Sequence, residues 1–298
     1  MMRALIVPCL SLFLMAQTAV PDPLTEARDL YNSGAYDQAI RAAQAARTVP
    51  ELESAAEVVL ARAYLERYRQ LSQADDLEAA REVMHGIDVA AFEPRERVEL
   101  FIALGTSIYI DETSGFDHRF AAAAEQFDLA FAGADLLDPS DRDQLFDWWA
   151  GSLDRQAQQG VTTERARIYE RILDRAEQEL REVPSSRAAA YWLAAGARGR
   201  GDLTRAIGAA VAGWVRAGAL GPDGDVLRID LDRLLRQVIL PERARELVPD
   251  GDPHPTLDML EDQWERFKAA WEGAPDDASS DADGELPIVI DPPIVIPD

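Results

Sequence analysis

Five alanines recur at nearly even spacing along the first two thirds of this chain of 298 residues. They are Ala39, Ala80, Ala123, Ala166 and Ala206, and the gaps between them are 41, 43, 43 and 40 residues. Around the first of them, further alanines at helical spacing leave one helix face small enough for a neighbouring helix to approach closely. Alanine is abundant here, so one match means little, but a fixed period of this size is typical of a helical repeat array.

A glycine opens the two best-preserved copies of the pattern. Residues 34–40, GAYDQAI, match residues 201–207, GDLTRAI, at the glycine, at the tyrosine-or-leucine position and at the final Ala-Ile. The three copies between them keep less of the pattern. Because glycine ends helices in the left-handed conformation, we predict positive φ or tight helix-to-helix turns at Gly34 and Gly201.

The first and fifth copies resemble tetratricopeptide (TPR) repeats. Ala27 and Tyr31 precede the glycine turn in the first copy, and Ala194 precedes it in the fifth. The period of that family is about 34 residues, so the middle copies need longer loops. The resemblance covers roughly residues 22–218, and it implies an α-solenoid that binds proteins or peptides and has no catalytic chemistry of its own.

We therefore predict an all-α protein, a right-handed TPR-like α-solenoid of about five helix pairs over residues 20–218. Beyond it, two apolar stripes at helical spacing predict further helices, one stopping before Pro241 and one reaching Trp271. Because the open end of a solenoid must be covered, residues 219–273 are predicted to be capping helices. Trp264 and Trp271 lie on the last stripe and are expected in the core.

Residues 1–19 are typical of a secretory signal peptide. Arg3 supplies the positive start, residues 4–15 are apolar, and small residues follow at plausible cleavage positions. Cys9 lies within the apolar run rather than after it, which argues against lipid attachment. We predict export to the periplasm or cell envelope, without stable membrane insertion after cleavage; the alternative is an uncleaved anchor or a chance apolar start.

Residues 274–298 are acidic, rich in proline and free of basic residues, and they are predicted to be a disordered tail. Pro-Ile-Val-Ile occurs there twice, at 287–290 and 293–296. Each copy can offer one short extended segment for recognition. The alternative is an incidental duplication in a disordered end.

Charge and motifs exclude several classes of function. The formal net charge of −24 argues against a nucleic-acid partner, which requires basic patches. The three histidines are far apart, and no phosphate-binding loop, dinucleotide turn or nucleophile motif is present. We therefore predict no enzymatic activity, no cofactor and no metal site.

The TPR resemblance implies that the first helix of each pair lines a concave groove. Arginine and aromatic residues are enriched at binding hot spots, and arginines there would favour a ligand that carries a carboxylate. The alternatives are that the arginines pair with nearby acids, and that Trp148 and Trp149 are core packing with one ring inside and one half-exposed. The predicted groove residues are Arg28, Tyr31, Arg62, Tyr109, Trp148, Arg155, Tyr191 and Arg198.

Three functions remain open at this point. The first is an exported, non-enzymatic scaffold that binds a protein or peptide partner in the cell envelope. The second is a ligand-binding accessory component of a transport system, similar to the T-component of TRAP transporters. The third is an enzyme whose site the sequence does not reveal. An open groove favours the first, and a closed cavity with apolar walls favours the second.

Overall fold

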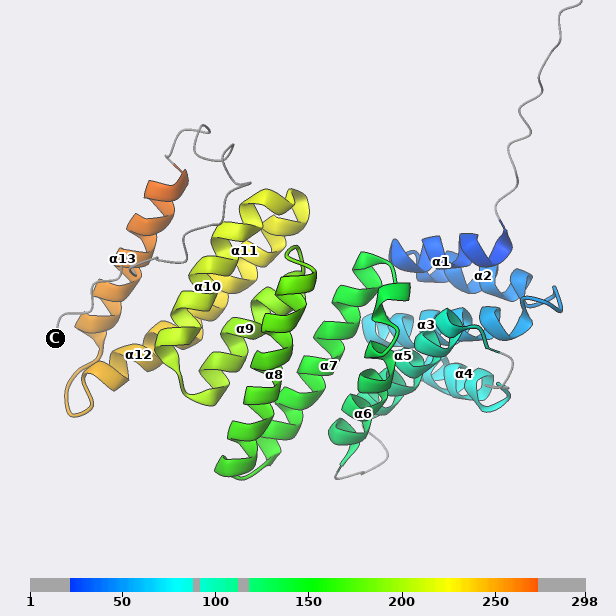
Figure 1. The fold of residues 1–298 in the computed structure, drawn as a ribbon, viewed down its shortest axis with the longest axis horizontal. Coiled ribbons are helices and arrows are strands. Elements are labelled where there is room, and N and C mark those ends of the chain that lie inside the picture. Colours follow the sequence, from blue (N-terminus) through cyan, green and yellow to red (C-terminus); the bar gives the residue numbers. More distant parts are fainter. Residues whose placement is uncertain (1–21, 88–91, 112–117, 273–298) are drawn as a thin grey trace, which may run out of the picture.

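A computed structural model describes residues 22–87, 92–111 and 118–272, and this part of the chain is all-α (Figure 1). The predicted signal peptide and the predicted acidic tail lie outside the described residues. None of the helices within the described ranges is long and apolar enough to cross a membrane. The α-helices are α1 (Pro23–Asn32), α2 (Tyr36–Ala46), α3 (Glu53–Leu71), α4 (Ala74–His85), α5 (Pro94–Ile110), α6 (Arg119–Phe131), α7 (Pro139–Gln159), α8 (Thr162–Glu182), α9 (Arg187–Arg200), α10 (Leu203–Ala217), α11 (Pro222–Leu234), α12 (Leu240–Leu247) and α13 (His254–Glu272).

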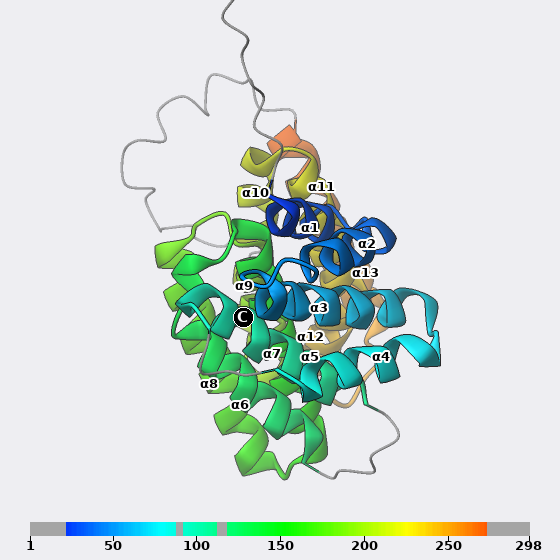
Figure 2. The ribbon, with the colours of Figure 1, turned by 90° about the vertical axis from the view of Figure 1, so that its right-hand side faces the viewer.

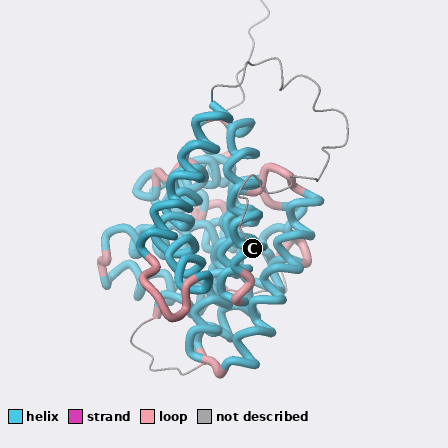
Figure 3. Tube along the Cα trace, turned by 90° about the vertical axis from the view of Figure 1, so that its left-hand side faces the viewer, coloured by secondary structure: helices cyan, strands magenta, loops and turns pink. Residues whose placement is uncertain are grey.

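The helices follow one another in space in nearly the same order as in the sequence. Consecutive helices pack together, as α1 does with α2, α5 with α6 and α9 with α10. A second set of contacts links the odd-numbered helices, from α1 through α3, α5, α7 and α9 to α11. Figure 1 shows the progression from α1 to α13, and Figure 2 views it from the α1 end. Figure 3 shows the described residues as helices and loops, with no strand among them. The odd-numbered helices from α1 to α11 thus form one connected layer.

Each of the five repeated alanines lies on a different even-numbered helix. Four of them are fully buried, because a methyl side chain lets the neighbouring helix approach closely. The exception lies in the first turn of α8, where the side chain is partly exposed and the buried contacts begin two residues later, at Ile168. The alanines on α2, α4, α6, α8 and α10 are Ala39, Ala80, Ala123, Ala166 and Ala206.

Both glycine turns adopt the predicted conformation. Gly34 has φ +75° and Gly201 has φ +87°, so the prediction of positive φ is confirmed. At the end of α9, the backbone N–H of Gly201 donates to the carbonyl of Arg198 at 2.9 Å, and that of Asp202 donates to the carbonyl of Ala197 at 3.0 Å. These bonds satisfy carbonyl groups that the helix end would otherwise leave without a partner.

Gly201→Val is expected to lower the free energy of unfolding by about 1 kcal/mol or more, because a β-branched residue fits poorly at positive φ. The cost is one of backbone conformation, since a Cβ at this position would meet no atom within 4 Å. Gly208→Ala on α10 is the control: its surroundings are equally open but its φ is not positive. Alanine there should stabilise the helix by about 0.5–1 kcal/mol. Urea unfolding of both variants measures these changes. If Gly201→Val has the same free energy of unfolding as wild type, the expectation is contradicted.

The C-terminal helices differ from the prediction at Pro241. The chain does not stop before this proline but runs from α11 through a π-helical turn, Leu235–Ile239, directly into α12. A proline lacks the backbone N–H and collides with the carbonyl four residues before it. The wider π-helical turn just before Pro241 accommodates both effects, so the chain stays helical.

The prediction that both Trp264 and Trp271 lie in the core is correct for Trp264 and wrong for Trp271. Trp264 is fully buried and packs against Trp214 of α10, with ring centroids 5.5 Å apart. Trp271 is 46% exposed. Trp271 lies in the last turn of α13, where its described ring contact is with Phe267 of the same helix.

Candidate functional site

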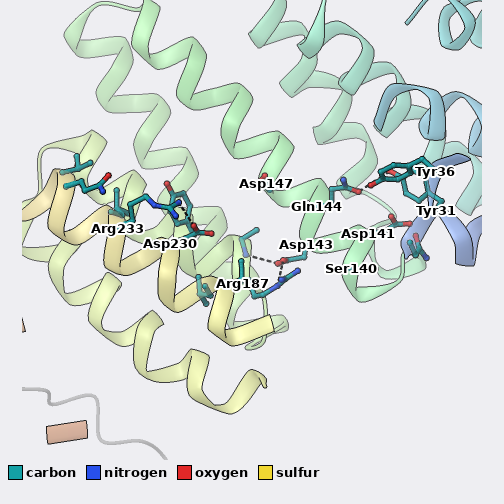
Figure 4. A pocket seen from close by; sticks show the side chains of 18 residues that line it. Tyr31, Tyr36, Ser140, Asp141, Asp143, Gln144, Asp147, Arg187, Asp230 and Arg233 are labelled. Carbon is teal, nitrogen blue, oxygen red and sulfur yellow. Dashed lines mark hydrogen bonds and ion pairs between the residues drawn. The ribbon is translucent and has the colours of Figure 1, made fainter. Parts of the chain in front are cut away.

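A cavity of about 670 Å³ opens on the layer of odd-numbered helices. Tyr31 of α1 and Tyr36 of α2 lie at one side of it, and Asp230 and Arg233 of α11 lie at the other (Figure 4). Residues of α7 and α9 form the wall between them. The cavity therefore joins segments that are up to two hundred residues apart in the sequence.

The α1 side of the cavity is held by a buried polar network. Arg62 of α3 forms an ion pair with Asp141 of α7 at 2.8 Å, and both side chains are almost fully buried. The guanidinium of Arg62 also lies 4.2 Å from the ring centroid of Tyr31. The Tyr31 hydroxyl donates to Gln144 at 3.3 Å, and burial raises the pKa of this phenol well above its usual value. These contacts fix the position of α7 against α1 and α3, and the Nε atom of Arg62 is buried without a hydrogen-bond partner among the described residues.

Asp143 holds the start of α9 against α7. Its carboxylate accepts hydrogen bonds from the Ser186 hydroxyl at 2.8 Å and from the backbone N–H of Ala188 at 3.0 Å. Arg187 lies 3.4 Å from the second oxygen. Asp143 therefore has a structural role in the cavity wall, because its charge and its acceptor atoms already have partners within the protein.

The rest of the cavity wall, formed by α7, α9 and α11, carries two acids, Asp147 and Asp230, that have fewer partners within the protein. One oxygen of Asp147 accepts the indole N–H of Trp192 at 2.8 Å. The Asp147 side chain is exposed at the cavity. Partial desolvation and the charge of Asp143 raise its pKa, while the Trp192 hydrogen bond and the charge of Arg69 act in the opposite direction. Asp230 pairs with Arg233 of its own helix at 3.0 Å, on an exposed surface where such pairs are weak. Between them, Tyr191 has a pKa raised first by burial and then by the charges of Asp230 and Asp147.

Asp147→Asn is expected to leave the free energy of unfolding within about 0.5 kcal/mol of wild type at pH 7, or to raise it. The pKa of Asp147 is higher in the folded protein than in the unfolded chain, so its charge opposes folding at neutral pH. The asparagine Oδ1 can still accept the Trp192 indole N–H. Asp141→Asn is the contrasting variant, because it leaves the buried Arg62 without its counter-ion and should destabilise clearly. Chemical unfolding measures both variants. If Asp147→Asn strongly lowers the free energy of unfolding, the charge of Asp147 does not oppose folding.

The eight predicted groove residues all lie on odd-numbered helices, but only two of them line the cavity. These two are Tyr31 and Tyr191. Tyr109 and Trp148 lie elsewhere on the layer, with their rings edge to face at 4.9 Å. Trp148 is partly exposed and its neighbour Trp149 is buried, as the core-packing alternative predicted.

Most of the predicted arginines have acidic partners. Arg28 donates twice to the buried Glu99, at 3.1 and 3.0 Å, and Arg62 is buried with Asp141. Arg198 donates through Nε to both carboxylate oxygens of Glu242 on α12. Arg155 is exposed and forms no ion pair or hydrogen bond with the described residues. The role of these residues in binding stays a prediction.

The sequence analysis missed the aspartates of the cavity. Acids are so frequent in this chain that no pair stands out in the sequence. One signal was available, because Asp143 and Asp147 are four residues apart and so share a face of α7. Asp230 could not be placed beside them without knowing how α11 packs.

Comparisons with protein-family models, with curated proteins and with solved structures found no match to this chain. The described residues also contain no group of three or more histidine, cysteine or acidic side chains placed to hold a metal ion. The site therefore has to be interpreted from its own geometry.

Proposed function

We propose that this protein is an exported, non-enzymatic scaffold that binds a segment of a partner protein in the cavity between α1, α7, α9 and α11. The observation that carries the proposal is the cavity itself, which α1, α7, α9 and α11 build together with Tyr36 of α2 and the π-helical turn after α11. Lining residues such as Val226 and Gln237 are exposed, so the site is open to solvent. An open site of this kind suits an extended segment.

The proposed architecture is a right-handed, TPR-like α-solenoid with α11 to α13 covering its C-terminal end. Three findings support it: the contacts among odd-numbered helices, the repeated alanines on even-numbered helices, and the two glycine turns with positive φ. In such an array the first helices of successive pairs line the concave side. Export rests on the pattern of residues 1–19 and on no structural finding.

The second candidate, an accessory component of a transport system similar to the TRAP T-component, draws support from the size of the cavity. About 670 Å³ falls in the range of small-molecule sites. Such sites are mostly apolar, however, whereas four aspartates and two arginines line this one. The polar walls favour a polypeptide ligand with charged side chains.

A substitution that fills the cavity tests the proposed function. Ser140, the second residue of α7, is exposed and lines the cavity, so Ser140→Trp should obstruct it without breaking any hydrogen bond. Thr163, the second residue of α8, is equally exposed and lies outside the cavity, so Thr163→Trp is the matched control. Tagged full-length variants are used to recover partners from an envelope extract, with quantification by mass spectrometry.

The proposal predicts a protein that wild type and Thr163→Trp recover equally and that Ser140→Trp recovers at least tenfold less well. Equal recovery of every partner by all three proteins would show that the cavity is not the binding site. Thermal unfolding of both tryptophan variants checks that neither loses its fold.

A further inference from the structure

We propose that an apolar strip formed by Val226 and Ile229 of α11 and Trp271 of α13 binds the C-terminal tail of the same chain, through the Pro-Ile-Val-Ile copy at 287–290. This copy lies outside the described residues, and the sequence predicts only that it is a recognition segment. The inference does not depend on the proposed function. It assigns a binding surface to the described helices and an occupant to that surface.

The strip collects large apolar side chains that the described residues leave exposed. Val226 is 53% exposed, Ile229 is 57% exposed and Trp271 is 46% exposed. Val226 and Ile229 are three residues apart and so lie side by side on α11. Val226 also lines the cavity, so the strip begins at the cavity rim. Single exposed apolar side chains are common, but several side by side favour an occupant that removes them from water.

The interface between α11 and α13 fixes the place of Trp271. Asp232 of α11 accepts a hydrogen bond from the ammonium group of Lys268 of α13 at 2.7 Å. Arg236, in the π-helical turn after α11, donates to Glu265, which precedes Lys268 on α13, at 3.1 Å. The contacts advance along one segment as they go back along the other. The two segments therefore run antiparallel at this interface.

Ile229 and Trp271 are the next pair along this antiparallel interface. Ile229 lies three residues before Asp232 on α11, and Trp271 lies three residues after Lys268 on α13. Residues three apart share a helix face, so each continues the face that the pair of Asp232 and Lys268 marks. Their exposed fractions show that the described residues leave both side chains uncovered. The strip therefore runs from the last turn of α13 across α11 to the cavity rim.

The tail copy suits the strip in spacing. A proline opens the copy and two more follow it closely, which disfavours a helix and favours an extended segment. In an extended segment, Ile288 and Ile290 point to the same side, about 7 Å apart. Side chains three apart on a helix have Cβ atoms about 5–6 Å apart. The two isoleucines can therefore pack against Val226 and Ile229 together.

The tail is the proposed occupant because it begins at the strip. The last described residue is Glu272, the neighbour of Trp271, and the copy begins at residue 287. A flexible linker over residues 273–286 would have a root-mean-square span of about 20 Å and a maximum of roughly 45–50 Å. Such a tether gives an effective concentration in the millimolar range. A contact too weak to hold a separate peptide can therefore form within the chain.

The charges of the tail favour docking through the copy alone. Residues 276–285 carry five acids and no basic residue, and an acidic protein repels such a segment. The copy at 287–290 carries no charged side chain. It is therefore the part of the tail that can approach an acidic surface and bury apolar area there.

Photo-crosslinking within the purified full chain tests the contact. Benzoylphenylalanine replaces Val289, inside the copy, and the crosslinked residues are located by mass spectrometry at low protein concentration. The measurement is repeated with the strip variant, Val226→Ser/Ile229→Ser. The control variant, Leu71→Ser/Leu129→Ser, replaces two leucines of α3 and α6 that are 55% and 50% exposed and lie outside the strip.

We expect crosslinks within one chain, from position 289 to α11 and to the last turn of α13. The strip variant should lower their yield at least fivefold, and the control variant should match wild type. As a second measurement, Ile288→Ser/Ile290→Ser should lower the yield by a similar factor. This change lies outside the described helices, so it tests the contact even if the strip variant is unstable.

Three results would overturn the proposal. The first is the absence of crosslinks to α11 and α13, whether or not other helices are crosslinked. The second is a yield that neither the strip variant nor the tail variant lowers. The third is a product that joins two chains in place of one, which would make a second copy of the protein the occupant of the strip.

Discussion

Replacing Arg62 by leucine is expected to lower the free energy of unfolding by about 3–5 kcal/mol, because the carboxylate of Asp141 would stay buried without a counter-ion. Both side chains are 4% exposed, so water cannot take the place of the lost guanidinium. The variant also loses the contact between Arg62 and the ring of Tyr31. Urea unfolding followed by circular dichroism measures the change.

The double variant Arg62→Leu/Asp141→Asn is the control for the ion pair. Removing both charges of a buried pair costs much less than removing one, so the second substitution should recover a large part of the lost stability. An exposed ion pair contributes at most about 1 kcal/mol to stability. If the free energy of unfolding of Arg62→Leu lies within about 1 kcal/mol of the wild-type value, the buried ion pair between α3 and α7 does not exist in solution.

Trp149→Ala should have an effect of similar size, about 3–5 kcal/mol, because it removes a large buried ring from the centre of the molecule. Trp149 is 2% exposed, and its ring lies edge to face with Phe131 at 5.7 Å and with Phe146 at 5.5 Å. Its indole N–H donates to Asp128 of α6 at 2.9 Å. The substitution therefore removes packing and a hydrogen bond between α6 and α7.

Trp271→Ala is the matched control for the tryptophan. This ring is about half exposed on the last turn of α13, and its described ring contact is with Phe267. Its loss should cost less than about 1 kcal/mol. Thermal unfolding that ranked Trp271→Ala as the more harmful change would mean that the core lies elsewhere than described.

Local backbone conformation could be predicted from the sequence, whereas contacts between residues that are distant in the sequence could not. The turns at Gly34 and Gly201 were predictable because only glycine takes a positive φ cheaply. Pro241 was misinterpreted because a local rule stops a helix there, while the chain continues through a π-helical turn that accommodates the proline.

The candidate site illustrates the same limit. Tyr31 and Tyr191 could be selected because they lie on the first helix of a pair and aromatic residues are enriched at binding hot spots. The roles of Arg28 and Arg62 could not, since their partners, Glu99 and Asp141, are 71 and 79 residues away.

Site-specific photo-crosslinking in living cells tests most directly whether the cavity on the odd-numbered helices binds a partner. The photoreactive residue benzoylphenylalanine is placed at Ser140, which lines the cavity, or at Thr163, the equivalent position on α8 outside it. We predict a crosslinked partner from position 140 and little or none from position 163. Crosslinking from position 163 with none from position 140 would contradict the proposed site.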